Sequence, residues 1–206
     1  LSLTRALGVA QLDRQARFMR HLEKTGRLDR AIEFLPSDEQ MAERQAAGQG
    51  LSSPELAVLL AYSKMWLSEQ LVDSDLPEDP WVAAALRRYF PALLREKFAH
   101  YIPRHPLKRE IIATHVLNRM INRVGPTFVH RMTEMTGAAP GQIVRAYLAM
   151  REVFCHGLLW KQIEALDNVV DDAVQAAMIQ HLKSVSARAT SWFLHPRRLA
   201  EAMQPL

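Results

Sequence analysis

The stretch HPLKREIIATHVLNRMINRVGPTFVHRM, residues 105–132, decides the fold of this chain. On a helical wheel with 100° per residue, its first part shows one broad apolar face, made of Leu107, Ala113, Val116, Leu117, Met120, Ile121 and Val124. Burying about seven such side chains contributes roughly 10 to 20 kcal/mol before ordering entropy is subtracted. We therefore expect a central helix near residues 107–124, with the other helices packed around it.

The opposite face of the same helix is polar. Asn118 and Asn122 stand one turn apart, flanked by Arg119 and Arg123. Such an edge suits a carboxylate ligand, an acidic loop of a neighbouring subunit or an adjoining domain, although a solvated edge explains the pattern equally well. The candidate interface consists of Lys108, His115, Asn118, Arg119, Asn122 and Arg123.

Helical patterns account for the rest of the chain. Apolar spacing predicts an amphipathic helix over 1–24, ended by Gly26, and a short helix over 28–35. N-caps at Ser37, Ser53 and Asp79 and helix-opening prolines predict the others. They span 37–47, 54–72, 79–90, 91–101, 126–137, 140–154, 158–166 and 169–193, with a bend or break at Gly157.

No strand of useful length and no repeat is visible. The predicted fold class is therefore all-α, an irregular bundle of about eight to ten helices. We expect two parts: a helical arm over 1–50 that continues from an upstream domain, and a C-terminal helical domain over 51–206. The chain opens on Leu1 without a methionine and so reads as a piece of a longer protein.

The composition is that of a folded soluble protein, with 49% apolar and 23% charged residues among 206. The longest apolar run, 56–62, has seven residues, whereas a helix that crosses a bilayer needs about twenty. No membrane partner is expected. The single Cys155 rules out a disulfide framework and favours a reducing cytoplasm.

Charge is unevenly distributed along the chain. The net charge is +4, but the segment 87–131 carries ten Lys or Arg and only two acids. Acidic clusters at 73–79 and 164–172 flank this basic segment. We expect these segments to neutralise one another, in the fold or across a subunit contact, in preference to a site for an acidic partner. Tyr89, Phe90 and Tyr101 suit nucleic-acid stacking, but they abut prolines in an apolar pattern, so we predict core packing and no nucleic acid.

Three features resemble catalytic or ligand sites only superficially. Gly48 and Gly50 precede a helix, but Ser53 replaces the third glycine of a dinucleotide fingerprint, so a loop is predicted. Lys64 is expected to reach solvent or pair with an acid and not to act as a base. Four histidines lack the i, i+4 spacing of metal ligands, and surface or hydrogen-bonded roles are predicted for His100, His105, His115 and His130.

Six blocks carry a family resemblance that covers about residues 28–192. They are GQGLSSPELAVLLAYSK (48–64), SDLPEDP (74–80), YFP (89–91), the stretch at 105–132, AYLAMREVF (146–154) and LLWKQIEALDN (158–168). In this order they resemble the C-terminal helical region of the large bacterial NAD-specific glutamate dehydrogenases. That family oxidatively deaminates L-glutamate to 2-oxoglutarate and ammonia with reduction of NAD, in a long multidomain homo-oligomer that serves amino-acid catabolism.

The resemblance places the catalytic lysine and aspartate and the nucleotide-binding unit of the family upstream of this region. It therefore implies no catalytic, cofactor-binding or metal-binding residue in this chain, and NAD bound outside it. The implied role is to brace the catalytic domain of the same polypeptide and to contribute to subunit contacts, which favours a protein surface as the partner of the polar edge. The alternative is a free-standing helical adaptor that binds an acidic protein partner.

Overall fold

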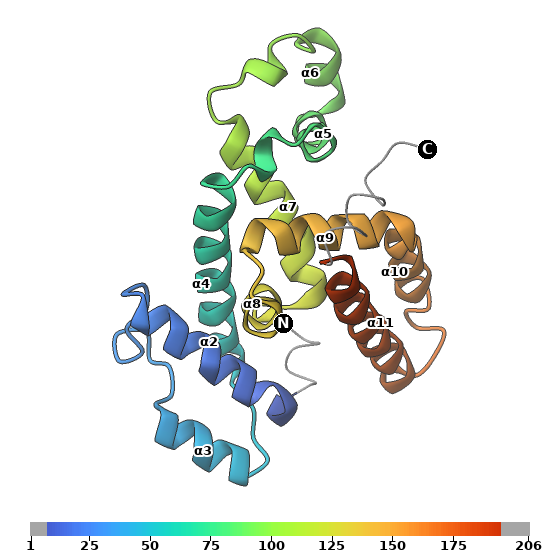
Figure 1. Ribbon diagram of the computed structural model, residues 1–206. Helices are drawn as coiled ribbons and strands as arrows, with labels where there is room; N and C mark the ends of the chain where they lie inside the picture. Colours follow the sequence, from blue (N-terminus) through green and yellow to red (C-terminus); the bar gives the residue numbers. More distant parts are fainter. Residues whose placement is uncertain (1–7, 195–206) are drawn as a thin grey trace.

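The computed structural model describes residues 8–194, and within that range the regular elements are ten α-helices and three short 3-10 helices (Figure 1). This confirms the all-α prediction. None of these helices is long and apolar enough to cross a membrane. In chain order the elements are η1 (Gly8–Gln11), α2 (Leu12–Lys24), α3 (Asp38–Ala46), α4 (Ser53–Val72), η2 (Leu76–Glu78), α5 (Pro80–Tyr89), α6 (Ala92–Lys97), η3 (Ile102–Arg104), α7 (Lys108–Val124), α8 (Phe128–Thr136), α9 (Pro140–Val153), α10 (His156–Glu164) and α11 (Asp172–Phe193).

Two helices, α7 and α9, form the centre of the bundle. α7 packs against α4, α5 and α11, whereas α9 packs against α4, α8, α10 and α11. In Figure 1 both helices lie between α4 and α11, with α5 and α6 at one end of α4 and α2 and α3 at the other. The central position predicted for residues 107–124 is confirmed, and α9 shares it. The buried side chains of α9 are Ile143, Val144, Ala146, Tyr147, Ala149 and Met150.

The apolar face of α7 differs from the predicted one at its first position. Leu107 is 55% exposed, because the helix begins only at Lys108 and Leu107 serves as its N-cap. The buried face instead starts with Ile112, which the wheel had not assigned to it. From there the prediction is confirmed for Ala113, Val116, Leu117, Met120 and Ile121, while Val124 is half-buried against the core.

The predicted short helix over 28–35 is wrong. Its residues form a turn in which the Asp29 carboxylate accepts a hydrogen bond from the Ala31 N–H at 2.9 Å, and Phe34 has a φ of 53°. The Arg30 guanidinium forms ion pairs with Glu23 at 2.7 Å and Asp38 at 3.0 Å. These contacts with flanking segments hold the turn, and they are not visible in the local apolar spacing.

Helix N-termini follow the predicted capping signals closely. Ser37 caps α3 and Asp79 caps α5, both as predicted. The cap of α4 is Ser52 and not Ser53: its hydroxyl accepts from the Glu55 N–H, and the Glu55 carboxylate accepts from the Ser52 N–H at 2.7 Å. This reciprocal pair satisfies two N–H groups that would otherwise be free, which explains the one-residue shift.

Other boundaries differ more from the predictions. The break after α9 falls at Cys155, which is exposed and has a φ of 47°, whereas Gly157 lies within α10. The predicted helix 91–101 is shortened to α6, and a turn leads from it into η3. α11 starts at Asp172 and not at residue 169. Three of its apolar side chains are exposed, namely Val174, Met178 and Val185.

The acidic cluster at 73–79 does neutralise part of the basic segment. Glu78 forms ion pairs with Lys108 and Arg109, both at 2.8 Å. Asp79 lies 3.1 Å from the guanidinium of Arg145 on α9. These contacts fix the turn after α4 to both central helices. The division at residue 50 stays a prediction, and residues 1–7 and 195–206 of the predicted first helix and last domain lie outside the described range.

We predict that Leu117→Ala lowers the free energy of unfolding by about 2 to 5 kcal/mol, because this side chain is only 2% exposed and its removal leaves a cavity. The matched control is Leu107→Ala on the same helix, which should change stability by less than about 0.5 kcal/mol. Urea denaturation followed by circular dichroism measures both. Equal losses would mean that the buried face of α7 is assigned incorrectly.

Candidate functional site

The structure brings only part of the candidate interface together. His115 and Arg119 line a cleft of about 130 Å³ beside α7. Lys108 is engaged with Glu78, and the guanidinium of Arg123 lies 4.9 Å from the centre of the Trp160 ring. Asn118 and Asn122, half-buried and exposed respectively, do not line the cleft. Whether any of the six residues contacts a partner stays a prediction.

The cleft lies between α5, α7 and α9 and has one apolar and one basic wall. α5 supplies the apolar wall through Trp81, Val82, Ala84 and Ala85. The basic wall combines the last turn of α5 with the polar edges of the two central helices. Spacing of i, i+4 places His115 next to Arg119 on α7, and Tyr147 next to Arg151 on α9. The charged and polar side chains of the cleft are Arg88, His115, Arg119, Tyr147, Arg151 and Glu152.

Positive charge dominates this cleft. Arg151 pairs with Glu152 at 3.0 Å, whereas Arg88 and Arg119 form no ion pair within residues 8–194. Burial lowers the pKa of His115, and the charges of Arg119, Arg88 and Arg151 lower it further. The pKa of Arg119 is also lowered, first by burial and then by neighbouring arginines. The neutral His115 ring can accept a hydrogen bond from Arg119, whose Nη1 lies 3.5 Å from Nε2.

Tyr147 adds an unsatisfied donor to the cleft. The side chain is 1% exposed, and its hydroxyl has no hydrogen-bond partner in the described part of the chain. Burial raises the pKa of this hydroxyl, while the nearby charges of Arg151, Arg123 and Arg119 act in the opposite direction. The cleft therefore offers several donors and one carboxylate. It is suited to hold an anionic group, such as a carboxylate of another protein segment.

A buried histidine lies behind the cleft. His156 is 2% exposed, and its Nε2 lies 2.7 Å from the Ser186 hydroxyl, which donates to the Leu182 carbonyl at 2.6 Å. Since the hydroxyl proton is used in that bond, the imidazole donates to the serine oxygen. Burial, reinforced by Arg123 and Arg151, lowers the pKa of His156 to about 4. The ring is therefore neutral at pH 7 and adds no charge to the cluster.

Sequence reasoning missed Arg88, Tyr147 and Arg151. The i, i+4 spacing of Tyr147 and Arg151 within AYLAMREVF was a usable signal, since it places a hydroxyl and a guanidinium on one helical edge. Arg88 carried no such signal, because its position depends on how α5 crosses α7.

The other sequence candidates do not form a site. Gly48 and Gly50 lie in the loop between α3 and α4, as predicted, and Lys64 is half-buried. His130 is buried and is not a surface histidine: its ring centre lies 4.7 Å from that of His21, and its Nδ1 lies 3.7 Å from the Glu134 carboxylate. Within residues 8–194, no group of three or more His, Cys, Asp or Glu side chains is placed to hold a metal ion.

The prediction that three aromatic residues pack in the core is wrong for two of them. Tyr89 and Tyr101 are 54% and 60% exposed, whereas Phe90 packs against the core. The segment that carries them, from the end of α5 to η3, projects from one end of the bundle in Figure 1. The two tyrosines therefore contact aromatic rings close in the sequence, Tyr89 that of Phe90 and Tyr101 that of His100, and do not enter the core.

We predict that Arg119→Gln raises the pKa of His115 toward its ordinary value, because a positive charge that disfavours the imidazolium is removed. Titration of the imidazole carbon protons by NMR measures the change. Arg87→Gln is the matched control, since this neighbouring arginine does not line the cleft and should leave the pKa of His115 unchanged. An unchanged pKa in Arg119→Gln would contradict the electrostatic account of the cleft.

Comparison with known proteins gives consistent results. The family described as "Glutamate dehydrogenase, C-terminal" matches residues 48–204. The NAD-specific glutamate dehydrogenase of Pseudomonas aeruginosa is 44% identical over 201 residues, which cover 95% of this chain and 12% of that protein. The enzyme of the same name from Halomonas elongata is 44% identical over 200 residues, again 12% of its length.

A more distant relative, the NAD-specific glutamate dehydrogenase of Mycobacterium tuberculosis, is 34% identical over 197 residues, which cover 96% of this chain and 12% of that protein. The chain thus spans about 12% of the length of the curated relatives it matches. Since the family match covers most of the sequence, the chain belongs to the glutamate dehydrogenase C-terminal family.

Proposed function

We propose that this chain is a non-catalytic helical segment of an NAD-dependent glutamate dehydrogenase. The intact protein would convert L-glutamate, NAD and water to 2-oxoglutarate, ammonia and NADH in the cytoplasm. The segment would brace the catalytic domain of the same polypeptide and contribute to contacts in a homo-oligomer. The observation that carries the proposal is the match of nearly the whole chain to one part of three much longer enzymes of that name.

The helical architecture favours a non-catalytic role for this segment. A dinucleotide site of the common kind lies at a strand-to-helix turn, where glycines let the backbone approach the pyrophosphate. Residues 8–194 contain helices and turns but no strand, and the only sequence that resembles such a turn, at Gly48 and Gly50, follows a helix. We therefore assign NAD binding and hydride transfer to other parts of the intact polypeptide.

The surface supports a bracing role. Arg88 and Arg119 present unpaired charge in the cleft, and a carboxylate of an adjoining domain or subunit would neutralise it. Large apolar side chains are also exposed, which is typical of surfaces that contact other protein parts. They include Leu93, Phe98 and Tyr101 near α6, and Leu158, Leu159 and Met178 on α10 and α11.

The alternative, a free-standing helical adaptor for an acidic partner, has less support. The same basic cleft would serve it, but all three relatives carry the matching region within a much longer enzyme.

The non-catalytic assignment is tested by assaying residues 1–206 and the intact polypeptide side by side with L-glutamate and NAD. We expect the intact protein to reduce NAD, detected by absorbance at the NADH band, and the 206-residue chain to give no rate above a blank. Reduction of NAD by the chain alone would show that the segment is catalytic. No reduction by the intact protein would contradict the proposed reaction itself.

The bracing assignment is tested by Arg119→Glu in the intact polypeptide. Charge reversal in the cleft should repel the carboxylate that we expect from an adjoining domain or subunit, and should therefore lower the thermal stability or the oligomer mass of the assembly. Calorimetry and light scattering measure these quantities. The control, Lys24→Glu at the exposed end of α2, should leave both unchanged. If both variants had the same thermal stability and the same oligomer mass, the cleft would not be part of the interface.

A further inference from the structure

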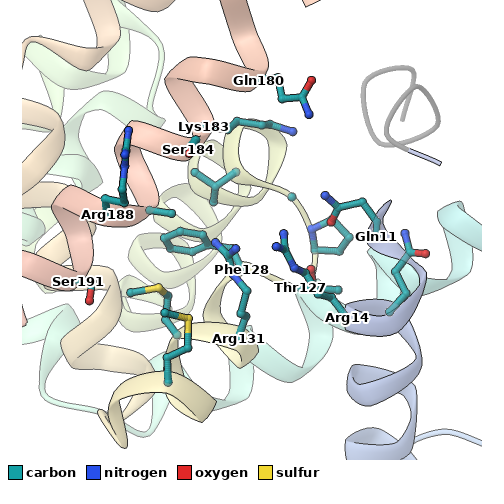
Figure 2. A pocket seen from close by; sticks show the side chains of 17 residues that line it. Gln11, Arg14, Thr127, Phe128, Arg131, Gln180, Lys183, Ser184, Arg188 and Ser191 are labelled. Carbon is teal, nitrogen blue, oxygen red and sulfur yellow. The ribbon is translucent and has the colours of Figure 1, made fainter. Parts of the chain in front are cut away.

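A second and larger pocket lies away from the cleft, between α2, α8 and α11 (Figure 2). Its volume is about 490 Å³, within the range of small-molecule sites in proteins. The turn from α7 to α8, residues 124–127, forms its floor together with the first residues of α8. Elements that are far apart in the sequence therefore enclose it, and no part of the proposed bracing role uses it.

The pocket is lined by basic side chains and by no acidic side chain. Arg14 of α2, Arg131 of α8 and Lys183 and Arg188 of α11 line it, and no carboxylate does. In Figure 2 the side chains of Arg14, Arg131 and Lys183 reach toward the same hollow from three helices. None of these four cations forms an ion pair with another residue of the range 8–194, although all four other arginines of α2 and of the turn that follows do.

Two of these charges, Lys183 and Arg131, are partly removed from water. Burial lowers the pKa of Lys183 to about 8. Burial also lowers the pKa of Arg131, and the charge of Arg14 lowers it further. The repulsion between Arg14 and Arg131 and the desolvation of Arg131 and Lys183 both disfavour the empty pocket, and a bound anion would relieve both effects.

A helix N-terminus and a neutral side chain also line the pocket. α8 begins in the pocket wall at Phe128, whose N–H donates to the Gly125 carbonyl at 3.5 Å. The N-cap Thr127 makes no side-chain capping bond, so the next two N–H groups of the first turn have no side-chain cap. Gln15 is 2% exposed and lines the pocket, and its side-chain oxygen has no partner in the described residues. The side-chain oxygen of Gln15 can therefore accept a hydrogen bond from a hydroxyl group of a ligand.

We propose that this pocket binds a small phosphate-bearing molecule. Lys183, Arg14 and Arg131 would hold the phosphate at the N-terminus of α8, and the organic part would lie against Met135, which lines the pocket and is exposed. A phosphate matches the site better than a single carboxylate, because three cations and a helix N-terminus require more acceptor oxygens than a carboxylate has. The proposal is independent of the dehydrogenase assignment.

The test is calorimetric titration of the full chain with inorganic phosphate and with phenyl phosphate, at low ionic strength. Both should bind saturably, and phenyl phosphate more tightly, because it adds apolar contact. Lys183→Met should weaken binding by about tenfold, as expected for one lost charge-assisted hydrogen bond. The matched control, Lys161→Met on the exposed side of α10, should bind as the wild type does. If inorganic phosphate and phenyl phosphate bound with equal affinity, the site would bind free phosphate, and the proposal of an organic ligand would be overturned.

A pH series with sulfate separates Lys183 from the arginines. Sulfate keeps its charge between pH 7 and pH 9.5, and the other charged groups that line the pocket are the guanidinium groups of Arg14, Arg131 and Arg188. Affinity should therefore fall with rising pH as Lys183 loses its proton, and Lys183→Arg should bind as tightly with no such fall. No saturable binding to the folded wild-type chain, or equal weakening in Lys183→Met and Lys161→Met, would overturn the proposal.

Discussion

The burial of the apolar faces of α7 and α9 is the constraint on which the rest of the structure depends. Each helix turns one face to the core, and this orientation fixes which polar residues remain at its edge. His115 and Arg119 on α7, and Tyr147 and Arg151 on α9, are brought to one cleft because both helices bury the opposite side. The position of the candidate site is therefore a consequence of core packing.

The distribution of carboxylates explains why both pockets are basic. The acids at 75–79 are used by Lys108, Arg109 and Arg145, which fasten the turn after α4 to the central helices. Glu23 and Asp38 are used by Arg30 in the turn after α2. No carboxylate lines the pocket and only Glu152 lines the cleft, so the cations of both keep a net positive field. The net charge of only +4 does not reveal this separation of basic from acidic side chains.

Local signals determined what could be predicted. The helices and most of their N-termini followed from apolar spacing and caps, because both depend on residues within one or two turns. The turn at 28–35 depends on the ion pairs of Arg30 with Glu23 and Asp38, which the apolar spacing does not contain, and no local signal marks the break at Cys155. Arg119 was identified from its place on the polar edge of α7, whereas Arg88, Arg131 and Lys183 became candidates only when the crossing of separate helices placed them around a common space.

The two basic sites differ in ways that favour different partners. The cleft is small, and its arginines Arg88 and Arg119 are largely exposed, so a side chain presented by another protein surface can reach them. The pocket is larger, and its cations Arg131 and Lys183 are half-buried. Desolvated cations gain most from a compact anion of high charge, since water no longer screens the interaction. The burial of the cations, and the resulting loss of screening by water, therefore distinguish a site for a small ligand from a surface for protein contacts. The number of charges matters less.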